Sequence, residues 1–267
     1  MIPDCLMPPR PVAAEVAPRK TLIVVPTYNE AENAPVMCRE IQKLGLSADV
    51  LFVDDNSPDG TGRILEELKA GQPRLIVQHR EGKLGIGSAH RDAIRWAYEQ
   101  GFETVVTLDC DFSHSPADIP AMIRAVEAAD VSVGSRWTRR GSLPGWSLLR
   151  RCMTLGGHLL TTFVLGMPHD ASGAFRAYRL DRLPREVFDL VRSRGYSFFL
   201  ESLFIIHVNR FTIVEVPLIL PARASGDSKM SLSDAVRSAS RVFELAWHDW
   251  RHPSRFRLET VRGVRRP

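Results

Sequence analysis

The strongest constraint on the fold is a regular alternation between Thr21 and Ser135 of short β-branched apolar runs and segments with helical periodicity. The apolar runs are "TLIVV", "VLFV", "RLIVQ", "TVVTL" and "VSVGS". The amphipathic segments between them are "EAENAPVMCREIQKL", "DGTGRILEELKA", "SAHRDAIRWAYEQ" and "SPADIPAMIRAVEA". This order is typical of a parallel sheet covered by helices on both faces. With 267 residues, 44% of them hydrophobic, the chain can form one large α/β domain, with or without an extension.

Acidic pairs follow two of the predicted strands. Asp54 and Asp55 come after "VLFV", and Asp109 and Asp111 come at the end of "TVVTL". Parallel strands present their carboxyl ends at one edge of the sheet, where ligands bind. One aspartate there could simply cap the next helix, but two pairs at one edge favour a divalent-metal or ribose site. Carboxylates in a D-x-D arrangement suit Mg²⁺ or Mn²⁺, which prefer hard oxygen ligands.

The loop "EGKLGIGSAHRD" is rich in glycine but fits neither a dinucleotide-binding nor a Walker motif. His90 stands where the third glycine of G-x-G-x-x-G is required, and no glycine fingerprint follows the first strand. Its glycines allow either an ordinary tight turn or a close approach of the backbone to a ligand.

Positive charge is concentrated in two places. Residues 251–267 hold six arginines and one glutamate, a surplus of five charges, so with a net charge of +4 the rest of the chain sums to −1. The segment 131–169 contains no acidic residue and includes Arg136, Arg139, Arg140, Arg150 and Arg151. Such segments are either solvated surface or contacts for an anionic partner such as phosphate or lipid headgroups.

Other features bound the compartment. The four cysteines are widely spaced and form no C-x-x-C, which argues against a disulfide framework or zinc cluster and fits a reducing cytoplasm. Residues 1–20 are rich in proline and lack a signal-peptide core, which predicts a disordered leader. No apolar stretch reaches the ~18 residues of a membrane-spanning helix, so we predict no transmembrane segment.

Residues 231–250 have the periodicity of an amphipathic helix. The apolar stripe consists of Leu232, Ala235, Val236, Ala239, Val242, Phe243, Ala246, Trp247 and Trp250. Arg237, Arg241 and Asp249 lie off this stripe. An aromatic face followed by an arginine-rich tail indicates an interfacial helix on a membrane. The alternative is a helix that packs on the main domain, and both descriptions can hold along its length.

Together, several motifs resemble those of dolichol-phosphate mannose synthases, also called polyprenol monophosphomannose synthases, which are inverting family 2 glycosyltransferases of the GT-A fold. The resemblance extends from about Thr21 to about Trp250. It is carried by "VVPTYNEAENAP", "VDDNSPDGT", "KLGIGSAHRDA", "LDCDFSHSP", "VGSRW", "DASGAFRAYR" and "VEVPLILPARASGDSKM". It implies a GT-A, Rossmann-like domain over residues 21–230 with a mostly parallel sheet, followed by the amphipathic helix and basic tail of residues 231–267.

The resemblance also implies roles for individual residues. Those expected around the nucleotide are Pro26, Tyr28 and Glu30 in the pocket wall, and Val53 and Asp55 at the base and ribose. The D-x-D that grips diphosphate and metal matches Asp109, Cys110 and Asp111, with Ser113 as a further metal contact. Cationic contacts to the sugar nucleotide match Arg136, Arg223 and Lys229, and contacts to the acceptor phosphate match Arg150 and Thr154.

Physical chemistry is consistent with these roles. A diphosphate is well bound by arginine forks and lysine point charges. Arg223 and Lys229 flank Gly226, a pattern suited to a mobile loop that closes over the nucleotide. A polyprenyl phosphate is already an anion, since its second pKa is about 6, and it needs little help from a general base.

The implied reaction is metal-dependent transfer of mannose, with inversion, from GDP-mannose to a polyprenyl phosphate, with Mg²⁺ or Mn²⁺ as cofactor. Three positions near the expected sugar and acceptor region bear on the donor. Ala222 and Phe199 differ from many relatives, whereas Glu201 matches an acidic position of the family. UDP-glucose is therefore the alternative donor. A catalytically idle nucleotide-sugar or lipid-phosphate binding protein is the alternative outside this class, and no nucleic-acid motif accompanies the basic tail.

For its surroundings, the chain resembles the family members without their own membrane helices. We expect a peripheral protein on the cytoplasmic face of the membrane, in contact through the C-terminal helix and basic tail. A small membrane-anchoring partner is possible.

Overall fold

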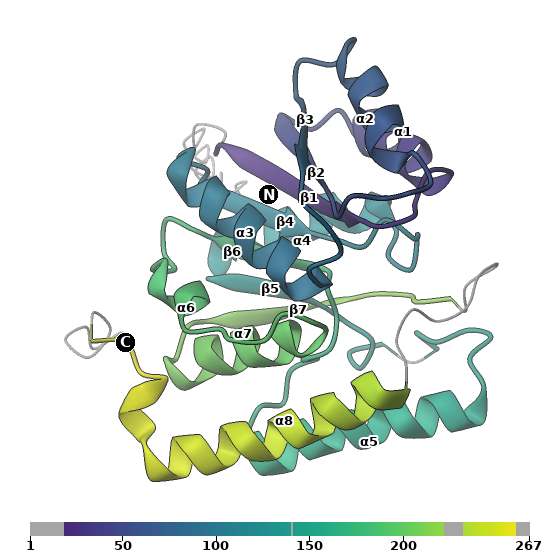
Figure 1. Cartoon of the computed structure of the whole chain (residues 1–267). Helices are drawn as coiled ribbons and strands as arrows, with labels where there is room; N and C mark the ends of the chain where they lie inside the picture. The colour runs from purple at the N-terminus through teal and green to yellow at the C-terminus, as the bar shows by residue number, and fades with distance from the viewer. Residues whose placement is uncertain (1–18, 140, 222–231, 260–267) are drawn as a thin grey trace, which may run out of the picture.

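The computed structural model describes residues 19–139, 141–221 and 232–259. Within these residues the fold is built on a seven-stranded sheet with the order β3-β2-β1-β4-β6-β5-β7 (Figure 1). The strands are β1 Thr21–Thr27, β2 Ala48–Asp54, β3 Leu75–His79, β4 Thr104–Thr107, β5 Val131–Ser135, β6 Arg176–Arg179 and β7 Ile213–Pro217. β6 runs antiparallel to β4 and β5, and all other pairings are parallel. The prediction of a mostly parallel α/β sheet is confirmed.

Helices cover both faces of this sheet. They are α1 Asn33–Lys43, α2 Thr61–Lys69, α3 Ile86–Glu99, α4 Ile119–Ala128, α5 Leu148–Leu165, α6 Glu186–Asp189, α7 Ser197–Val208 and α8 Leu232–Arg251, with short 3₁₀ turns at Pro116–Asp118 and Pro253–Arg255. The long helices α5 and α8 lie side by side at the end of the molecule opposite α1 and α2 (Figure 1). Among the described residues, every helix falls short of the length and apolar character needed to cross a bilayer.

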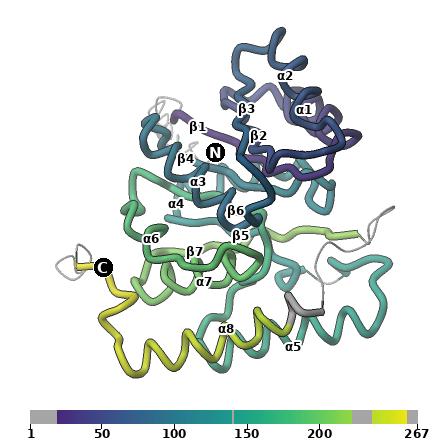
Figure 2. The backbone as a smooth tube through the Cα atoms, in the orientation of Figure 1, coloured from purple at the N-terminus to yellow at the C-terminus, as the bar shows by residue number. Residues whose placement is uncertain are grey.

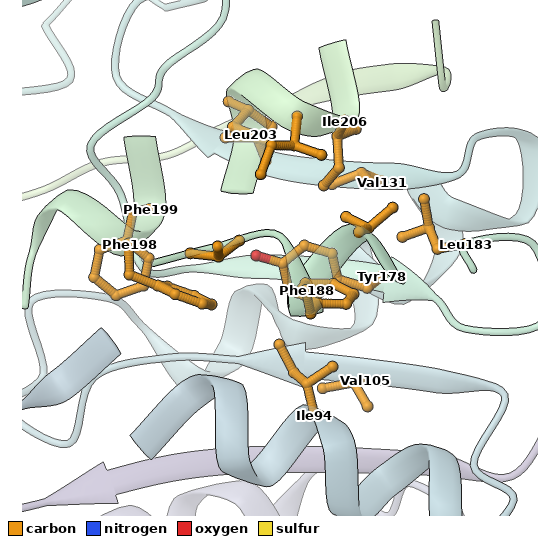
Figure 3. Close-up of a cluster of buried hydrophobic side chains, with 14 of the residues drawn as sticks. Ile94, Val105, Val131, Tyr178, Leu183, Phe188, Phe198, Phe199, Leu203 and Ile206 are labelled. Atoms are coloured by element: carbon orange, nitrogen blue, oxygen red, sulfur yellow. The ribbon is translucent and has the colours of Figure 1, made fainter. Parts of the chain in front are cut away.

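Alternating strand residues divide the interior into two cores, as the period of two in a β-strand requires. Leu22 and Val24 of β1 face the core formed with α3, α6, α7 and α8. Ile23 and Val25 face the core formed with α1, α2 and α4. The first core is rich in aromatic side chains, which meet between β6, α6 and α7 (Figure 3). Both faces of the sheet are therefore buried, which explains why the strands read as continuous apolar runs.

His90 is an unusual member of the first core. It lies on α3, is fully buried, and packs against Phe198 and Phe199 with ring-centroid distances of 5.9 and 5.0 Å. Neither ring nitrogen has a hydrogen-bond partner. Burial lowers the pKa of His90 to about 3, and the positive charge of Arg176 adds to the effect. The ring is therefore neutral in the folded protein at any pH near neutrality.

We expect His90 to make the fold sensitive to acid. Below pH ~6.5 the unfolded chain binds a proton at this ring and the folded chain does not, so stability falls by ~1.4 kcal/mol per pH unit until about pH 3. The His90→Leu variant should therefore lose ~2 kcal/mol less than the wild type between pH 7 and 5. Urea unfolding at both pH values measures this difference. His252→Leu, at an exposed position, is the control, and equal pH dependence in all three proteins would contradict the assignment.

Candidate active site

The predicted functional residues gather at one edge of the sheet because of its topology. β2 and β4 run parallel to β1, and β5 runs parallel to β4 since both are antiparallel to β6. The carboxyl ends of β1, β2, β4 and β5 therefore share one edge, here called the rim. Tyr28, Asp55, Asp109 and Arg136 follow these four ends. The expectation that the two acidic pairs lie at one edge is confirmed.

The turn after β4 carries two carboxylates, and the orientation of one of them, Asp111, is fixed by a hydrogen bond. Asp111 Oδ1 accepts a hydrogen bond from the backbone N–H of Ser113 at 2.9 Å. Phe112, between Asp111 and Ser113, has a φ of 57°, in the left-handed region that non-glycine residues rarely occupy. The Cys110 side chain is buried in the core beside α4, whereas Asp109 and Asp111 are half-buried. The side chain of Cys110 is therefore less accessible than the two carboxylates beside it, and its role at the diphosphate stays a prediction.

The donor set of this turn fits a hard divalent cation. Within the described residues, no group of three or more His, Cys, Asp or Glu side chains could hold a metal ion. This excludes a site made wholly of such ligands there, such as a structural zinc site. The two carboxylates of Asp109 and Asp111 on one turn suit Mg²⁺ or Mn²⁺, because these ions commonly take one or two carboxylates and complete their shell with substrate phosphates and water.

The two aspartates after β2 have different roles. Asp54 accepts hydrogen bonds from Thr27 Oγ1 at 3.3 Å and from the backbone N–H and hydroxyl of Ser57 at 3.1 and 2.5 Å. It therefore organises the turn after β2, and it does not cap the next helix, since the N-cap of α2 is Gly60. Asp55 is also buried but forms an ion pair with Arg80, at 2.5 Å between Oδ1 and Nη1. Burial raises the pKa of Asp55, and Arg80 opposes that shift.

Sequence reasoning missed Arg80. Its guanidinium is buried and also donates to Ser88 Oγ at 2.6 Å, with Asp92 at 3.3 Å. Arg80 thus ties the end of β2 to the beginning of α3. Arg80 follows the carboxyl end of β3, which runs parallel to β2, and this position in the sequence could have indicated that it lies at the rim.

Two of the predicted nucleotide-pocket residues lie in or just after β1. Pro26 and Tyr28 are half-buried. Lys83, which sequence reasoning also missed, places its Nζ 4.2 Å from the centroid of the Tyr28 ring, a cation–π geometry. The loop before α3 therefore covers one face of Tyr28.

Glu30 and Val53, predicted to contact the nucleotide, are both buried, 6% and 1% exposed. Glu30 accepts a hydrogen bond from Asn33 Nδ2 at 2.7 Å, and its backbone N–H donates to Thr61 Oγ1 at 2.9 Å. The Val53 side chain packs in the core beside α3. A role for Val53 at a base or ribose could involve only its backbone.

Arg136 has a partner that sequence reasoning did not assign. Its Nε lies 2.7 Å from Asp170 Oδ2, and its backbone N–H donates to the same oxygen at 3.2 Å. Asp170 is fully buried and is the first acidic residue after the acid-free segment 131–169. The ion pair fixes the orientation of the guanidinium and uses its Nε–H, so an anion at the rim could be met by its terminal N–H groups.

Arg150 and Thr154 lie one helical turn apart near the beginning of α5. The guanidinium of Arg150 stacks 3.7 Å from the ring centroid of Trp146, another residue without an assigned role. The Thr154 hydroxyl donates to the carbonyl of Arg150 at 2.8 Å. Both side chains therefore project from the same face of α5, and Arg150 is held in place by an aromatic ring.

Some residues named from the sequence are buried, and others lie outside the described part of the chain. Phe199 and Glu201, expected near the sugar and acceptor region, are both buried in α7, 2% and 0% exposed, and their position relative to a bound sugar stays a prediction. Glu201 pairs with Arg241. Arg223 and Lys229, together with Ala222, lie outside the described residues, as do the leader before residue 19 and the tail after residue 259.

Comparisons of the sequence with known proteins give a consistent result. Residues 22–183 match the family model described as Glycosyl transferase family 2. The chain is 36% identical over 249 residues to polyprenol monophosphomannose synthase of Mycolicibacterium smegmatis, covering 92% of this chain and 91% of the relative. It is also 36% identical to undecaprenyl-phosphate mannosyltransferase of Micrococcus luteus, over 83% of this chain and 93% of the relative.

Solved structures support the fold. Glucosyl-3-phosphoglycerate synthase from Mycobacterium tuberculosis, in complex with Mn²⁺, UDP and phosphoglyceric acid, superposes with a TM-score of 0.59. The match covers 89% of this chain and 78% of that one at 20% identity. At this identity the comparison supports the GT-A-like arrangement of strands and helices.

Proposed function

The chain belongs to glycosyl transferase family 2 and is a glycosyltransferase, and we propose that it transfers mannose from GDP-mannose to a polyprenyl phosphate. The observation that carries the proposal is the ordered turn with Asp109 and Asp111, at the rim it shares with Asp55 and Arg136. The sugar and acceptor follow from the relatives, which are named as mannosyltransferases and as acting on polyprenol or undecaprenyl phosphate.

In this proposal the rim binds the donor. Asp109 and Asp111 would hold Mg²⁺ or Mn²⁺, which neutralises the charge on the diphosphate when bound. The structural neighbour that contains Mn²⁺ together with UDP is a precedent for such a metal. Tyr28 and Asp55 lie where the nucleoside would stand, with Arg80 fixing the Asp55 carboxylate. Ser113, Cys110 and the loop with Arg223 and Lys229 stay predictions.

The acceptor phosphate would approach from the side of α5. Arg136 and Arg150 bring positive charge toward that region, and each is held by a neighbour: Asp170 for Arg136 and Trp146 for Arg150. The acceptor oxygen is anionic, so no general base is required. An in-line displacement of the nucleoside diphosphate inverts the anomeric carbon, and these residues contribute positioning and charge stabilisation.

Contact with a membrane would supply this lipid acceptor, and α5 has the surface for it. The side of α5 that packs on the protein is mixed in polarity. Leu160, Val164 and Leu165 pack against the core, beside the more polar Thr154, Thr161 and His158, the last stacked on Trp137 at 4.7 Å. The opposite face exposes large apolar side chains: Leu148 (77%), Leu155 (45%), Leu159 (43%) and Phe163 (81%).

α8 lies beside α5 (Figure 1) and also exposes apolar side chains. Val242 and Leu245 pack into the core, whereas Val236, Phe243, Trp247 and Trp250 are exposed. The packing of α8 on the domain is therefore observed, and the exposed aromatic side chains support our proposal that the same helix also lies on a membrane surface. We call the exposed apolar side chains of α5 and α8 the outer face. Contiguous exposed apolar patches often mark contact with a membrane or another protein, and Arg150, Arg151 and Arg251 adjoin the outer face in sequence, which favours an anionic lipid surface on the cytoplasmic side.

Direct assay of transfer tests the function. Purified protein is incubated with Mn²⁺ or Mg²⁺, a short-chain polyprenyl phosphate in detergent, and radiolabelled GDP-mannose or UDP-glucose in parallel. We expect label in the lipid fraction from GDP-mannose, and its loss on chelation of the metal. Label from UDP-glucose alone would show that the donor is UDP-glucose, and the proposed site at the rim would stand.

If neither donor gives transfer, the protein either binds a nucleotide sugar without transferring it or does not bind one, and a binding experiment separates these two cases. A ligand that binds the folded state raises its melting temperature. Stabilisation by GDP-mannose and metal without transfer would favour the non-catalytic alternative or a missing membrane-anchoring partner, and addition of native membranes would separate these two. No stabilisation by either nucleotide sugar would contradict the proposed site.

A further inference from the structure

Glu201 and Arg241 form a buried connection between α7 and α8. Arg241 Nη2 lies 2.7 Å from Glu201 Oε1, while its Nη1 reaches the exposed carboxylate of Glu244 at 2.7 Å. Glu201 also accepts two backbone hydrogen bonds, from Arg192 at 3.1 Å and Ser193 at 2.9 Å. Its carboxylate therefore joins three parts of the chain: α7, α8 and the segment between α6 and α7.

That segment in turn supports the beginning of α3. The path of the chain from α6 into α7 can be followed in Figure 2. The carbonyl of Arg194 accepts a hydrogen bond from the backbone N–H of Ser88 at 3.0 Å. A Cβ atom on Gly85 would come within 2.6 Å of this carbonyl, and one on Gly87 within 2.5 Å of the carbonyl of Gly195. These glycines are therefore required because residues 194–195 pack directly on them.

The beginning of α3 in turn fixes Asp55. Ser88 Oγ accepts from Arg80 Nη2 at 2.6 Å, and the other end of the guanidinium holds Asp55 at 2.5 Å. The backbone N–H groups of Leu84 and Gly85 also hydrogen-bond to the Asp55 carboxylate. A continuous set of hydrogen bonds and close packing thus runs from Arg241 on α8 to Asp55 at the rim.

We propose that Glu201 and Arg241 are positioning residues for the nucleotide: they hold residues 192–195 against the beginning of α3, which sets Arg80 and Asp55. This inference rests on the proposed function, because it takes Asp55 to face the donor. It assigns no contact between Glu201 or Arg241 and substrate. α8, which carries part of the outer face, is thereby connected to the donor end of the site.

The chemistry of the contact supports a role beyond stability. Burying an ion pair seldom stabilises a fold more than apolar side chains of the same size would. Glu201 lies among apolar residues of α7 such as Phe204 and Ile205, a helix that could have been apolar throughout. The Glu201 carboxylate forms directional hydrogen bonds to two backbone N–H groups and one arginine, which an apolar side chain cannot do.

The test compares two carboxylates that bind the same arginine. Glu201→Gln and Arg241→Met remove the buried pair, whereas Glu244→Gln makes the same chemical change at its exposed partner. Binding of GDP and UDP with Mn²⁺ is measured by calorimetry, and donor and acceptor KM by transfer to a short-chain acceptor without lipid. We expect the first two variants to weaken nucleoside diphosphate binding and raise donor KM about tenfold, with acceptor KM unchanged and Glu244→Gln equal to the wild type.

A purely structural role predicts a different pattern. Loss of folded protein lowers the apparent kcat and leaves donor KM and the nucleotide Kd unchanged, and that result would overturn the inference. If Glu201→Gln does not fold, Arg241→Met decides, because it leaves Glu201 its two backbone hydrogen bonds. Nucleotide binding is measured without any transfer step, so a wrong donor sugar in the proposed function would not obscure the outcome.

Discussion

Asp109→Asn and Asp111→Asn are each expected to reduce sugar transfer ~10³-fold or more, because a metal-held diphosphate loses several kcal/mol of transition-state stabilisation when a ligand charge is removed. Asparagine is the sharper choice over alanine at position 111. Its side-chain oxygen can still accept from the Ser113 N–H, as Asp111 Oδ1 does at 2.9 Å, so the turn is preserved and only the charge is removed. The measurement is kcat with GDP-mannose over a range of Mn²⁺ concentrations.

The control for these variants is Asp118→Asn, the same change at the N-cap position of α4, outside the turn of residues 109–113. It should keep wild-type activity. Melting temperatures of all variants should stay close to the wild type, since Asp109 and Asp111 are half-buried at the rim. Full activity in either Asp109→Asn or Asp111→Asn, or an equal loss in Asp118→Asn, would contradict the assigned roles.

The first half of the fold was predictable because its elements have clear periodicity. β1, β2, β3, β4 and β5 are buried parallel strands and read as apolar runs, and the helices between them each show one apolar face. The rim followed from the same reasoning, because the direction of the strands fixes where Asp55 and Asp109 lie. The C-terminal helix was also predicted, and α8 covers Leu232–Arg251.

The elements between β5 and α8 were not predicted, for identifiable reasons. β6 has the sequence RAYR, which reads as polar, yet Arg176 and Arg179 are buried and bound by Ser202, Asp181 and backbone carbonyls. α7 is buried on all sides, and a helix of that kind has no amphipathic period to detect. The partners of the buried arginines and the neighbours of α7 are far away in the sequence and are determined by the tertiary structure.

The partners within the site show the same limit. The strand pattern placed Asp55 at the rim, and the resemblance implied a contact between Arg136 and the sugar nucleotide. Neither could identify Arg80 or Asp170, each of which lies on a separate segment. Nor could the sequence distinguish Asp54, which organises a turn, from Asp55, which pairs with Arg80. Adjacent residues of one type acquire different roles only when the turn directs their side chains differently.

Removing apolar side chains from the outer face of α5 is expected to detach the protein from membranes. The double variant Leu159→Ser, Phe163→Ser should bind phospholipid vesicles ~50-fold more weakly, because two partly inserted side chains contribute roughly 2–3 kcal/mol together. The fold should be unaffected, since both side chains are exposed, Phe163 by 81%. Vesicle sedimentation with anionic and neutral lipid measures the binding, and an anionic preference is expected from the arginines that adjoin the outer face in sequence.

The design separates membrane contact from catalysis. Transfer to a short-chain polyprenyl phosphate in solution should match the wild type, whereas transfer to a long-chain acceptor in vesicles should fall with binding. Val36→Ser on α1, an exposed apolar residue at the other end of the molecule, is the matched control and should change neither. Unchanged vesicle binding in the double variant would contradict a lipid-facing role. Dissociation of an oligomer by the same substitutions would assign the outer face to a protein interface instead, because exposed apolar patches mark protein interfaces as well as membrane contacts.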